Sequence, residues 1–225
     1  MSTGSKTAEG RRCIALLGGS FDPVHNGHVA LGDYFAVLLH PDKLRVIPAG
    51  QPWQKNGLRT APEHRVEMLQ RAFARSKVPV TVDEQEIRRD GATYSIDTLR
   101  AIRSELGPEA SISFLIGADQ LQKLNTWKEW QRLFDYAHLC AASRPGFNMD
   151  AGHVPAEVQR EFTRRAATPE QIRNTPHGLT YLATNLAVDV SSTGIRDALE
   201  NGHHAGSLLP AGVLDYIKQH HLYRN

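Results

Sequence analysis

The chain has 225 residues, of which 40% are hydrophobic and 22% are charged, with a formal net charge of +2. This length suits one α/β domain or two small ones with a buried core. The nearly balanced charge gives no support for a duplex-binding surface, and no apolar run approaches the roughly 20 residues that span a membrane. Neither a nucleic acid nor a membrane is an expected partner.

Residues 1–11 are small and polar and lack the apolar stretch of a secretory signal. We expect them to form a disordered tail ahead of a single domain over residues 12–225. The two cysteines, Cys13 and Cys140, each lie within an apolar run. We interpret them as buried thiols in a reducing compartment, so the sequence predicts a cytoplasmic protein.

In the first half of the chain, short apolar runs alternate with helical patterns. The run CIALLGG is typical of a buried parallel strand, and Pro41 ends the helix that follows it. Val66, Leu69 and Phe73 have the spacing of a helix's core face. The predicted order is strand 13–19, helix 28–40, strand 43–50, helix 62–76, strand 80–89 and helix 95–107.

The second half of the chain continues the alternation. It is predicted as strand 111–119, helix 125–134, strand 137–146, helix 153–166, one or two strands within 179–190, and a helix over 192–201. This order predicts an α/β fold, a Rossmann-like doubly wound parallel sheet with helices on both faces and right-handed crossovers. In such sheets ligands bind beyond the carboxyl ends of the strands, near the reversal of strand order.

The first predicted strand is followed by GGSFDPVHNGH. Gly18 and Gly19 permit a tight turn and let a ligand approach bare backbone. If a helix begins near Asn26, its free amides favour an anion, and His25 and His28 face the same way from its first turn. We expect these histidines to bind phosphate oxygens. Capping histidines are one alternative, and a zinc pair is another, although no third ligand has suitable spacing.

A second anion-binding pattern lies in VDVSSTGIRDAL. A strand is expected to end at Val190, with Ser192 as the helix N-cap and Thr193 and Arg196 in the first turn. Free amides, hydroxyls and a guanidinium together bind phosphate. An ordinary capped helix with a surface arginine is the alternative, and the presence of the first motif favours phosphate.

Several segments carry a family resemblance. GGSFDPVHNGH resembles the (H/T)xGH signature of a nucleotidyltransferase superfamily, and SSTGIR resembles its second nucleotide motif. EIRRDGATYSIDTL, FLIGADQLQKLNTWKEW, SRPG and LLPAGVLDYIKQHHLY resemble segments of the bacterial nicotinate-nucleotide adenylyltransferases, in the family's order. The first motif is specific only to the superfamily, whereas the GAD…W segment together with YSIDTL indicates the narrower family.

The resemblance implies that ATP and nicotinate mononucleotide are joined to give deamido-NAD and pyrophosphate. The mononucleotide phosphate would attack the ATP α-phosphorus in line, without an enzyme nucleophile. The protein would then position two polyanions and neutralise charge on the leaving group. Mg²⁺ would be held mainly by ATP phosphates and water, so no protein metal ligand is assigned.

The resemblance also implies site residues. The expected ATP-binding residues are Gly18, Gly19, Ser20, Phe21, His25, His28, Gly117, Asp119, Ser192, Thr193 and Arg196, with His25, His28 and Arg196 catalytic. The expected mononucleotide-binding residues are Lys55, Thr93, Tyr94, Ser95, Trp127 and Arg144. Some alternatives stay open: Asp119 as a helix N-cap, Trp127 as a core residue like Trp130, and Arg144 in a surface ion pair.

One loop departs from the family pattern. Where the family usually carries P-P-H-K, this chain has QPWQK, so Lys55 keeps the cation, Gln54 replaces the imidazole and Trp53 adds bulk. This puts in doubt how the loop closes over the mononucleotide phosphate.

Other functions remain as alternatives. Phosphopantetheine adenylyltransferases and cytidylyltransferases would share the two nucleotide motifs but not GAD…W, and a nucleotide sensor without turnover would lack one of the catalytic residues. The sequence leaves open the preference for acid over amide and whether the chain forms a homo-oligomer.

Overall fold

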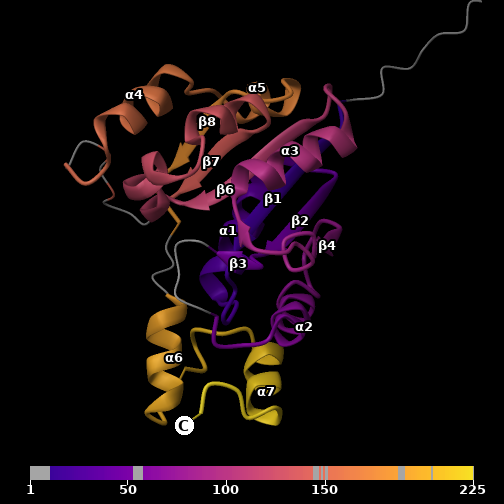
Figure 1. Cartoon of the computed structure of the whole chain (residues 1–225), viewed down its shortest axis with the longest axis vertical. Coiled ribbons are helices and arrows are strands. Elements are labelled where there is room, and N and C mark those ends of the chain that lie inside the picture. The colour runs from indigo at the N-terminus through magenta and orange to yellow at the C-terminus, as the bar shows by residue number, and fades with distance from the viewer. Residues whose placement is uncertain are drawn as a thin grey trace, which may run out of the picture.

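A six-stranded parallel sheet forms the centre of the computed structural model (Figure 1). Its strand order is β4-β2-β1-β6-β7-β8. The structure describes residues 11–52, 58–143, 147, 149, 152–186, 191–203 and 205–224. The strands are β1 (Cys13–Gly19), β2 (Lys43–Pro48), β4 (Val80–Val82), β6 (Ser111–Gly117), β7 (His138–Ala142) and β8 (Thr180–Ala183).

Strand order reverses between β1 and β6. From β1 the chain builds outward to β2 and β4, then returns to place β6 on the other side of β1, where Cys13 lies opposite Ser111. It then builds outward again to β7 and β8. This reversal is the position where the doubly wound fold was predicted to hold its ligand.

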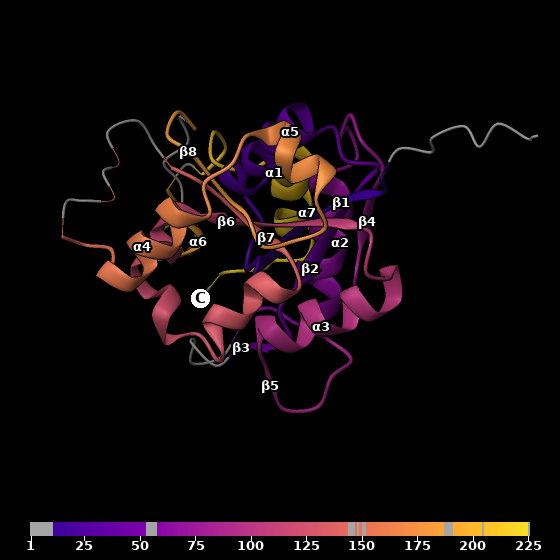
Figure 2. The ribbon, with the colours of Figure 1, turned by 90° about the horizontal axis from the view of Figure 1, so that it is seen from above.

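Helices cover both faces of the sheet (Figure 2). Side chains alternate along β1, so Ala15 and Leu17 join a core with α1, while Ile14 and Leu16 join a second core with α3. Burial on both faces explains why the strands read as continuous apolar runs. The α-helices are α1 (Asn26–Leu39), α2 (Pro62–Ala72), α3 (Ser95–Leu106), α4 (Ala156–Arg164), α5 (Pro169–Asn174), α6 (Ser192–Glu200) and α7 (Ala211–Gln219). The predicted fold class is confirmed.

The predicted helix over 125–134 is wrong. Two 3₁₀ helices, η1 (Ala118–Thr126) and η2 (Trp130–Asp135), occupy this region, and Trp127 between them has extended backbone with φ −74° and ψ 142°. The sequence explains the difference, because large apolar residues recur at every third position, which matches the three-residue turn of a 3₁₀ helix. These residues are Leu121, Leu124, Trp127, Trp130 and Leu133.

Other differences are smaller. The strand predicted over 80–89 ends at Val82, because the Asp83 carboxylate accepts the backbone N–H of Gln85 at 3.1 Å and starts a turn. The strand predicted over 111–119 ends at Gly117. A two-stranded parallel sheet of β3 (Gln51–Pro52) and β5 (Ala92–Thr93) was not predicted.

Helix α5 was also missed, although the sequence TPEQ carries its signal. Thr168 and Gln171 form a reciprocal capping box: the Gln171 N–H donates to Thr168 Oγ1 at 3.2 Å, and the Thr168 N–H donates to Gln171 Oε1 at 2.9 Å. Of the predicted tail, only Arg11 lies within the described residues, and its guanidinium pairs with Glu109 at 3.1 Å.

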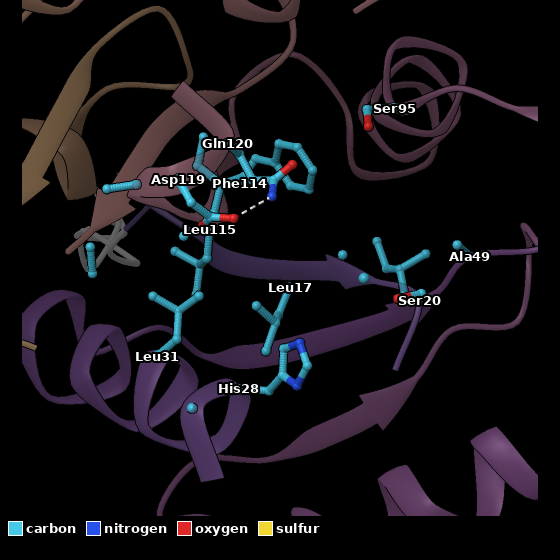
Figure 3. A pocket seen from close by; sticks show the side chains of 18 of the residues that line it. Leu17, Ser20, His28, Leu31, Ala49, Ser95, Phe114, Leu115, Asp119 and Gln120 are labelled. Carbon is cyan, nitrogen blue, oxygen red and sulfur yellow. Dashed lines mark hydrogen bonds between the residues drawn. The ribbon is translucent and has the colours of Figure 1, made fainter. Parts of the chain in front are cut away.

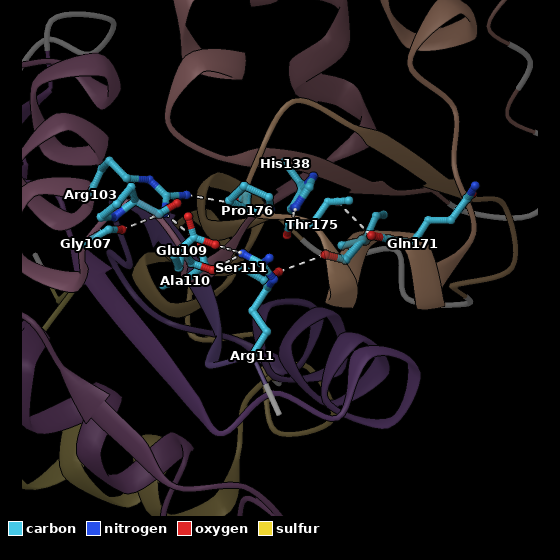
Figure 4. Close-up of polar contacts among 12 residues, drawn as sticks. Arg11, Arg103, Gly107, Glu109, Ala110, Ser111, His138, Gln171, Thr175 and Pro176 are labelled. Carbon is cyan, nitrogen blue, oxygen red and sulfur yellow. Dashed lines mark hydrogen bonds and ion pairs between the residues drawn. The ribbon is translucent and has the colours of Figure 1, made fainter. Parts of the chain in front are cut away.

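A polar cluster ties the amino ends of β6 and β7 to α5 (Figure 4). The Arg103 guanidinium donates to the carbonyls of Ala110 at 2.7 Å, Tyr136 at 2.8 Å and Pro176 at 2.8 Å. His138 is fully buried beside it, with Nε2 on the Thr175 carbonyl at 2.9 Å.

Every helix among the described residues is too short or too polar to cross a bilayer.

Candidate active site

A cavity of about 780 Å³ lies where the strand order reverses (Figure 3). It is lined by the ends of β1, β2, β6 and β7 and by the first turns of α1, α3, α6 and η1. His28 and Asp119 face it from opposite sides, and Ser95 lies farther along. The predicted site residues that line it are Gly18, Gly19, Ser20, His25, His28, Thr93, Ser95, Gly117, Asp119, Trp127, Ser192 and Thr193. Lys55 and Arg144 lie outside the described residues.

The turn after β1 needs its glycines for a reason different from the predicted one. A Cβ at Gly18 would meet the Phe114 ring at 3.1 Å, and a Cβ at Gly19 would meet the Phe21 ring at 3.0 Å. The left-handed backbone of the turn falls instead on Phe21, with φ 49°. Phe21 is fully buried and is not among the residues that line the cavity. Gly18 and Gly19 therefore leave room for the Phe114 and Phe21 rings.

His25 and His28 lie together at the start of α1, as predicted. Their rings stack with centroids 3.7 Å apart, and the backbone N–H of His25 donates to His28 Nδ1 at 3.3 Å. Since Nδ1 of the neutral ring accepts, its proton is on Nε2, which is a donor. Among the described residues, no group of three or more His, Cys, Asp or Glu side chains could hold a metal ion.

The start of α6 is bound to the turn after β1. The predicted N-cap, Ser192, is wrong by one position, because the helix begins at Ser192 and Ser191 is the N-cap. The Gly194 N–H donates to Ser191 Oγ at 3.1 Å. Ser192 Oγ donates instead to the carbonyl of Pro23 at 3.0 Å. The two predicted anion sites are therefore neighbours.

Arg196 lies behind this junction rather than along the cavity wall. Its Nη1 donates to the carbonyl of Asp22 at 2.6 Å, and its Nη2 donates to Thr193 Oγ1 at 3.1 Å. Within the described part of the chain, the Arg196 Nε is buried and has no hydrogen-bond partner. The guanidinium thus links α6 to the turn.

Asp119 lines the cavity just after β6. Its carboxylate accepts the side-chain N–H of Gln120 at 2.7 Å (Figure 3). A Cβ at Gly117 would lie 2.5 Å from Asp119 Oδ1, so a larger residue there would displace this carboxylate. Gly117, not Asp119, is the N-cap of η1. The N-cap alternative for Asp119 is therefore wrong.

Three of the six predicted acceptor residues line the cavity. Thr93, Ser95 and Trp127 line it, and the Trp127 ring packs edge-on against Phe114 with centroids 6.3 Å apart. In the described residues, the Trp127 Nε1 is buried without a hydrogen-bond partner. Tyr94 is not part of the lining, and the Lys128 ammonium lies 4.5 Å from the centre of its ring.

Sequence reasoning missed Glu86, which also lines the cavity. Its carboxylate accepts a hydrogen bond from Thr98 Oγ1 at 2.7 Å. Burial raises the pKa of Glu86, opposed chiefly by the hydrogen bond from Thr98 and the charge of Arg89. Glu86 opens the segment EIRRDGATYSIDTL, which was used as a family resemblance and as a strand and its exit, and no role was assigned to Glu86 itself.

The chain is similar to known proteins of one enzyme family. A sequence model of the family described as cytidylyltransferase-like matches residues 16–198. A relative from Herminiimonas arsenicoxydans, named a probable nicotinate-nucleotide adenylyltransferase, is 70% identical over 95% of this chain and 98% of its own. A relative of the same name from Laribacter hongkongensis is 43% identical over 96% of each chain.

A solved structure shares the fold. It is that of a Plasmodium falciparum nicotinic acid mononucleotide adenylyltransferase complexed with NaAD, which is 19% identical to this chain. The alignment has a TM-score of 0.73 and covers 95% of this chain and 98% of that one. At this identity the likeness is evidence for the fold alone.

Proposed function

Because the chain belongs to the nicotinate-nucleotide adenylyltransferases, within the cytidylyltransferase-like family, we propose that it joins ATP to nicotinate mononucleotide. The products are deamido-NAD and pyrophosphate. The observation that carries the proposal is the meeting of two helix amino termini, α1 and α6, at one turn beside the cavity. Thr93, Ser95 and Trp127 line the same cavity, so a second substrate has room next to the phosphates.

Phosphate binding follows from the chemistry of the turn. Gly18, Gly19 and Ser20 offer backbone to the ATP phosphates, and the amides that open α1 and α6 favour negative charge. His28 donates from Nε2, with His25 stacked on its ring. Ser192 and Thr193 line the cavity at the start of α6. Arg196, which does not line the cavity, holds Thr193 and the turn in place through its hydrogen bonds to Thr193 Oγ1 and the Asp22 carbonyl, and its contact with the outer phosphates remains a prediction.

The reaction needs no covalent intermediate with the protein. An oxygen of the mononucleotide phosphate forms a bond to the ATP α-phosphorus, and the bond from that phosphorus to the bridging oxygen of pyrophosphate breaks. The protein contributes orientation and donors to the oxygens that gain charge, which are large terms in phosphoryl transfer. Mg²⁺, held mainly by ATP phosphates and water, would supply further neutralisation of that charge.

Acceptor binding is proposed at the other end of the cavity. Trp127 stacks on the pyridine ring, Ser95 and Thr93 approach the nicotinate carboxylate, and Asp119 contacts the nucleotide. Tyr94, Lys55 and Arg144 remain predictions for this end of the site. The pairing of an indole with a flat heteroaromatic ring suits the apolar wall that Phe114 and Trp127 form.

The test is acceptor-resolved pyrophosphate release. The purified chain is incubated with Mg²⁺-ATP and, in separate reactions, with nicotinate mononucleotide, nicotinamide mononucleotide or phosphopantetheine. We expect pyrophosphate and an equal amount of deamido-NAD with the first acceptor and no release with phosphopantetheine. Release with phosphopantetheine but not with the mononucleotides would contradict the proposal, and binding of ATP without release in any reaction would indicate a nucleotide sensor.

A further inference from the structure

The turn after β1 is held from behind by a buried carboxylate. Asp22 is only 2% exposed, and both of its carboxylate oxygens are engaged. The Tyr223 hydroxyl donates to Oδ1 at 2.7 Å, and the backbone N–H of Arg59 donates to Oδ2 at 2.7 Å. Hydrogen bonds to a charged acceptor are stronger than neutral ones. Asp22 therefore joins the turn to a segment 201 positions away along the chain.

A buried arginine braces the same turn. Arg65 of α2 is 1% exposed, and its Nη1 donates to the carbonyl of Ser20 at 2.9 Å. Burial lowers the pKa of the Arg65 guanidinium, and the Asp22 charge opposes this effect. A buried cation is tolerated when an anion lies near it. Arg65 and Asp22 thus both hold the backbone between Ser20 and Pro23.

Tyr223 is placed for this contact at some conformational cost. Its backbone is left-handed, with φ 59°, a region that residues other than glycine rarely adopt. The side chain is nonetheless buried, at 9% exposed. Burial, together with the Asp22 charge, raises the pKa of Tyr223 above its ordinary value, so its hydroxyl keeps its proton and donates.

We propose that Tyr223 is a positioning residue for ATP, acting through Asp22 on the turn after β1. The proposal rests on the proposed function, because it assigns the phosphates to this turn. Ser20 and His25, which precede and follow Asp22 in the sequence, both line the cavity. A carboxylate fixed between them sets where the backbone of the turn and the start of α1 point. Tyr223 itself is not among the cavity-lining residues.

The same arrangement predicts which substrate is affected. The contacts around Asp22 end on the turn, on α2 and on α6. None of these hydrogen bonds ends on Thr93, Ser95 or Trp127, which belong to the acceptor end. Loss of the Tyr223 hydroxyl should therefore weaken ATP handling and leave the affinity for the mononucleotide unchanged.

The test compares two tyrosines of the carboxyl-terminal region. Tyr223→Phe removes the donor to Asp22 and keeps the ring. Tyr216→Phe is the matched control, because its hydroxyl hydrogen-bonds to His64 Nδ1 at 2.8 Å, between α7 and α2, away from the turn. Each variant loses one hydrogen-bonded hydroxyl, buried for Tyr223 and partly buried for Tyr216, so thermal unfolding measures the stability cost of each. Steady-state kinetics and equilibrium dialysis with ATP measure the effect that is specific to the turn.

We expect Tyr223→Phe to raise the KM and dissociation constant of ATP about tenfold, with the mononucleotide KM within about twofold of wild type. Tyr216→Phe should leave all three constants unchanged. In an Asp22→Asn background, Tyr223→Phe should add little, because the contact is already weakened. Equal effects of the two tyrosine variants, or an unchanged ATP dissociation constant in Tyr223→Phe, would overturn the proposal.

Two further arms keep the outcome decisive. If Tyr223→Phe does not fold, Asp22→Asn is compared with wild type, and an unchanged ATP dissociation constant overturns the proposal. If the wild-type chain releases no pyrophosphate with nicotinate mononucleotide, the proposed function fails. The dialysis experiment still decides whether Tyr223 governs ATP binding, because it needs no acceptor.

Discussion

His28 accepts a hydrogen bond at Nδ1 from the backbone N–H of His25, while the two imidazole rings stack 3.7 Å apart. This relationship orients the His28 ring and fixes its tautomer, because the accepting nitrogen cannot carry the proton in the neutral ring. The opposite nitrogen, Nε2, is thereby kept as a donor. In this histidine pair, His25 therefore orients the ring of His28, and His28 presents the Nε2 donor.

His28→Asn tests that division. The asparagine Oδ1 can still accept from the His25 amide, but the Nε2 donor is lost. We expect turnover to fall by about 10²–10³-fold, as for other donors to a charged transition state, with little change in thermal stability. His28→Ala should cost at least as much, and His153→Ala, at an exposed position outside the cavity, is the control. Near-normal turnover in His28→Asn would contradict the donor role.

Trp127→Ala tests stacking on the pyridine ring. Removing an aromatic platform should raise the KM for nicotinate mononucleotide roughly tenfold to a hundredfold, while the ATP KM stays within about twofold. Trp130→Ala is the matched control, since Trp130 packs against the same core but does not line the cavity. Initial-rate kinetics with each substrate varied in turn provide the measurement. Equal losses for both substrates in Trp127→Ala would count against stacking.

Gly50→Ala tests the wall next to Glu86. A Cβ at Gly50 would lie 2.0 Å from the Glu86 carbonyl oxygen and 3.2 Å from Thr93 Cγ2, so backbone must move. We expect a loss of about 1–3 kcal/mol in the free energy of unfolding and a raised KM for the mononucleotide. In Gly212→Ala the nearest atom is Arg71 Cβ at 3.7 Å, so stability should hold or rise. Urea unfolding that does not distinguish the two variants would refute this packing argument.

His138 makes stability depend on pH. Burial lowers its pKa to about 4 from the ordinary 6.5. Between these values the unfolded chain binds a proton that the folded chain does not. The contribution of neutral His138 to the free energy of unfolding is therefore complete above pH 6.5. It is lost as the pH falls toward 4, and the whole loss amounts to about 3 kcal/mol.

Urea unfolding at pH 7 and pH 4.5 measures this dependence. The loss of stability between the two pH values should be smaller in His138→Gln, which has no titrating ring, than in wild type. Because the other histidines are common to both proteins, the difference between them isolates His138. Parallel pH dependence in the two proteins would show that His138 is not responsible.

The alternation of strands and helices, and the position of both motif segments beside one cavity, could be predicted because their signals are local. The glycines, histidines and Arg196 lie within two short segments, and the doubly wound order brings strand ends together. One-residue details were less accessible: whether Ser191 or Ser192 caps α6 depends on where the helix begins. The period-three apolar pattern over 121–133 was readable, but it was interpreted as an amphipathic α-helix.

The contacts behind the site could not be predicted in the same way. The partners of Asp22 come from Arg59, Arg196 and Tyr223, and no spacing rule joins such distant positions. Glu86 is similar, because its carboxylate is buried beside Thr98, which lies 12 positions further along the chain. Carboxylates of this kind look like ordinary surface residues until the chain is folded.

Because β1 pairs with β6, the active site can form only late in folding. The first strand takes its second neighbour from almost halfway along the chain, and α6 reaches the turn after β1 from later still. Such distant closures slow folding, because chain entropy is lost before the contacts form. No early fragment contains a weaker version of the site. Catalysis should therefore emerge in a single step with the completed sheet, and during denaturation turnover should vanish together with the sheet's circular dichroism signal.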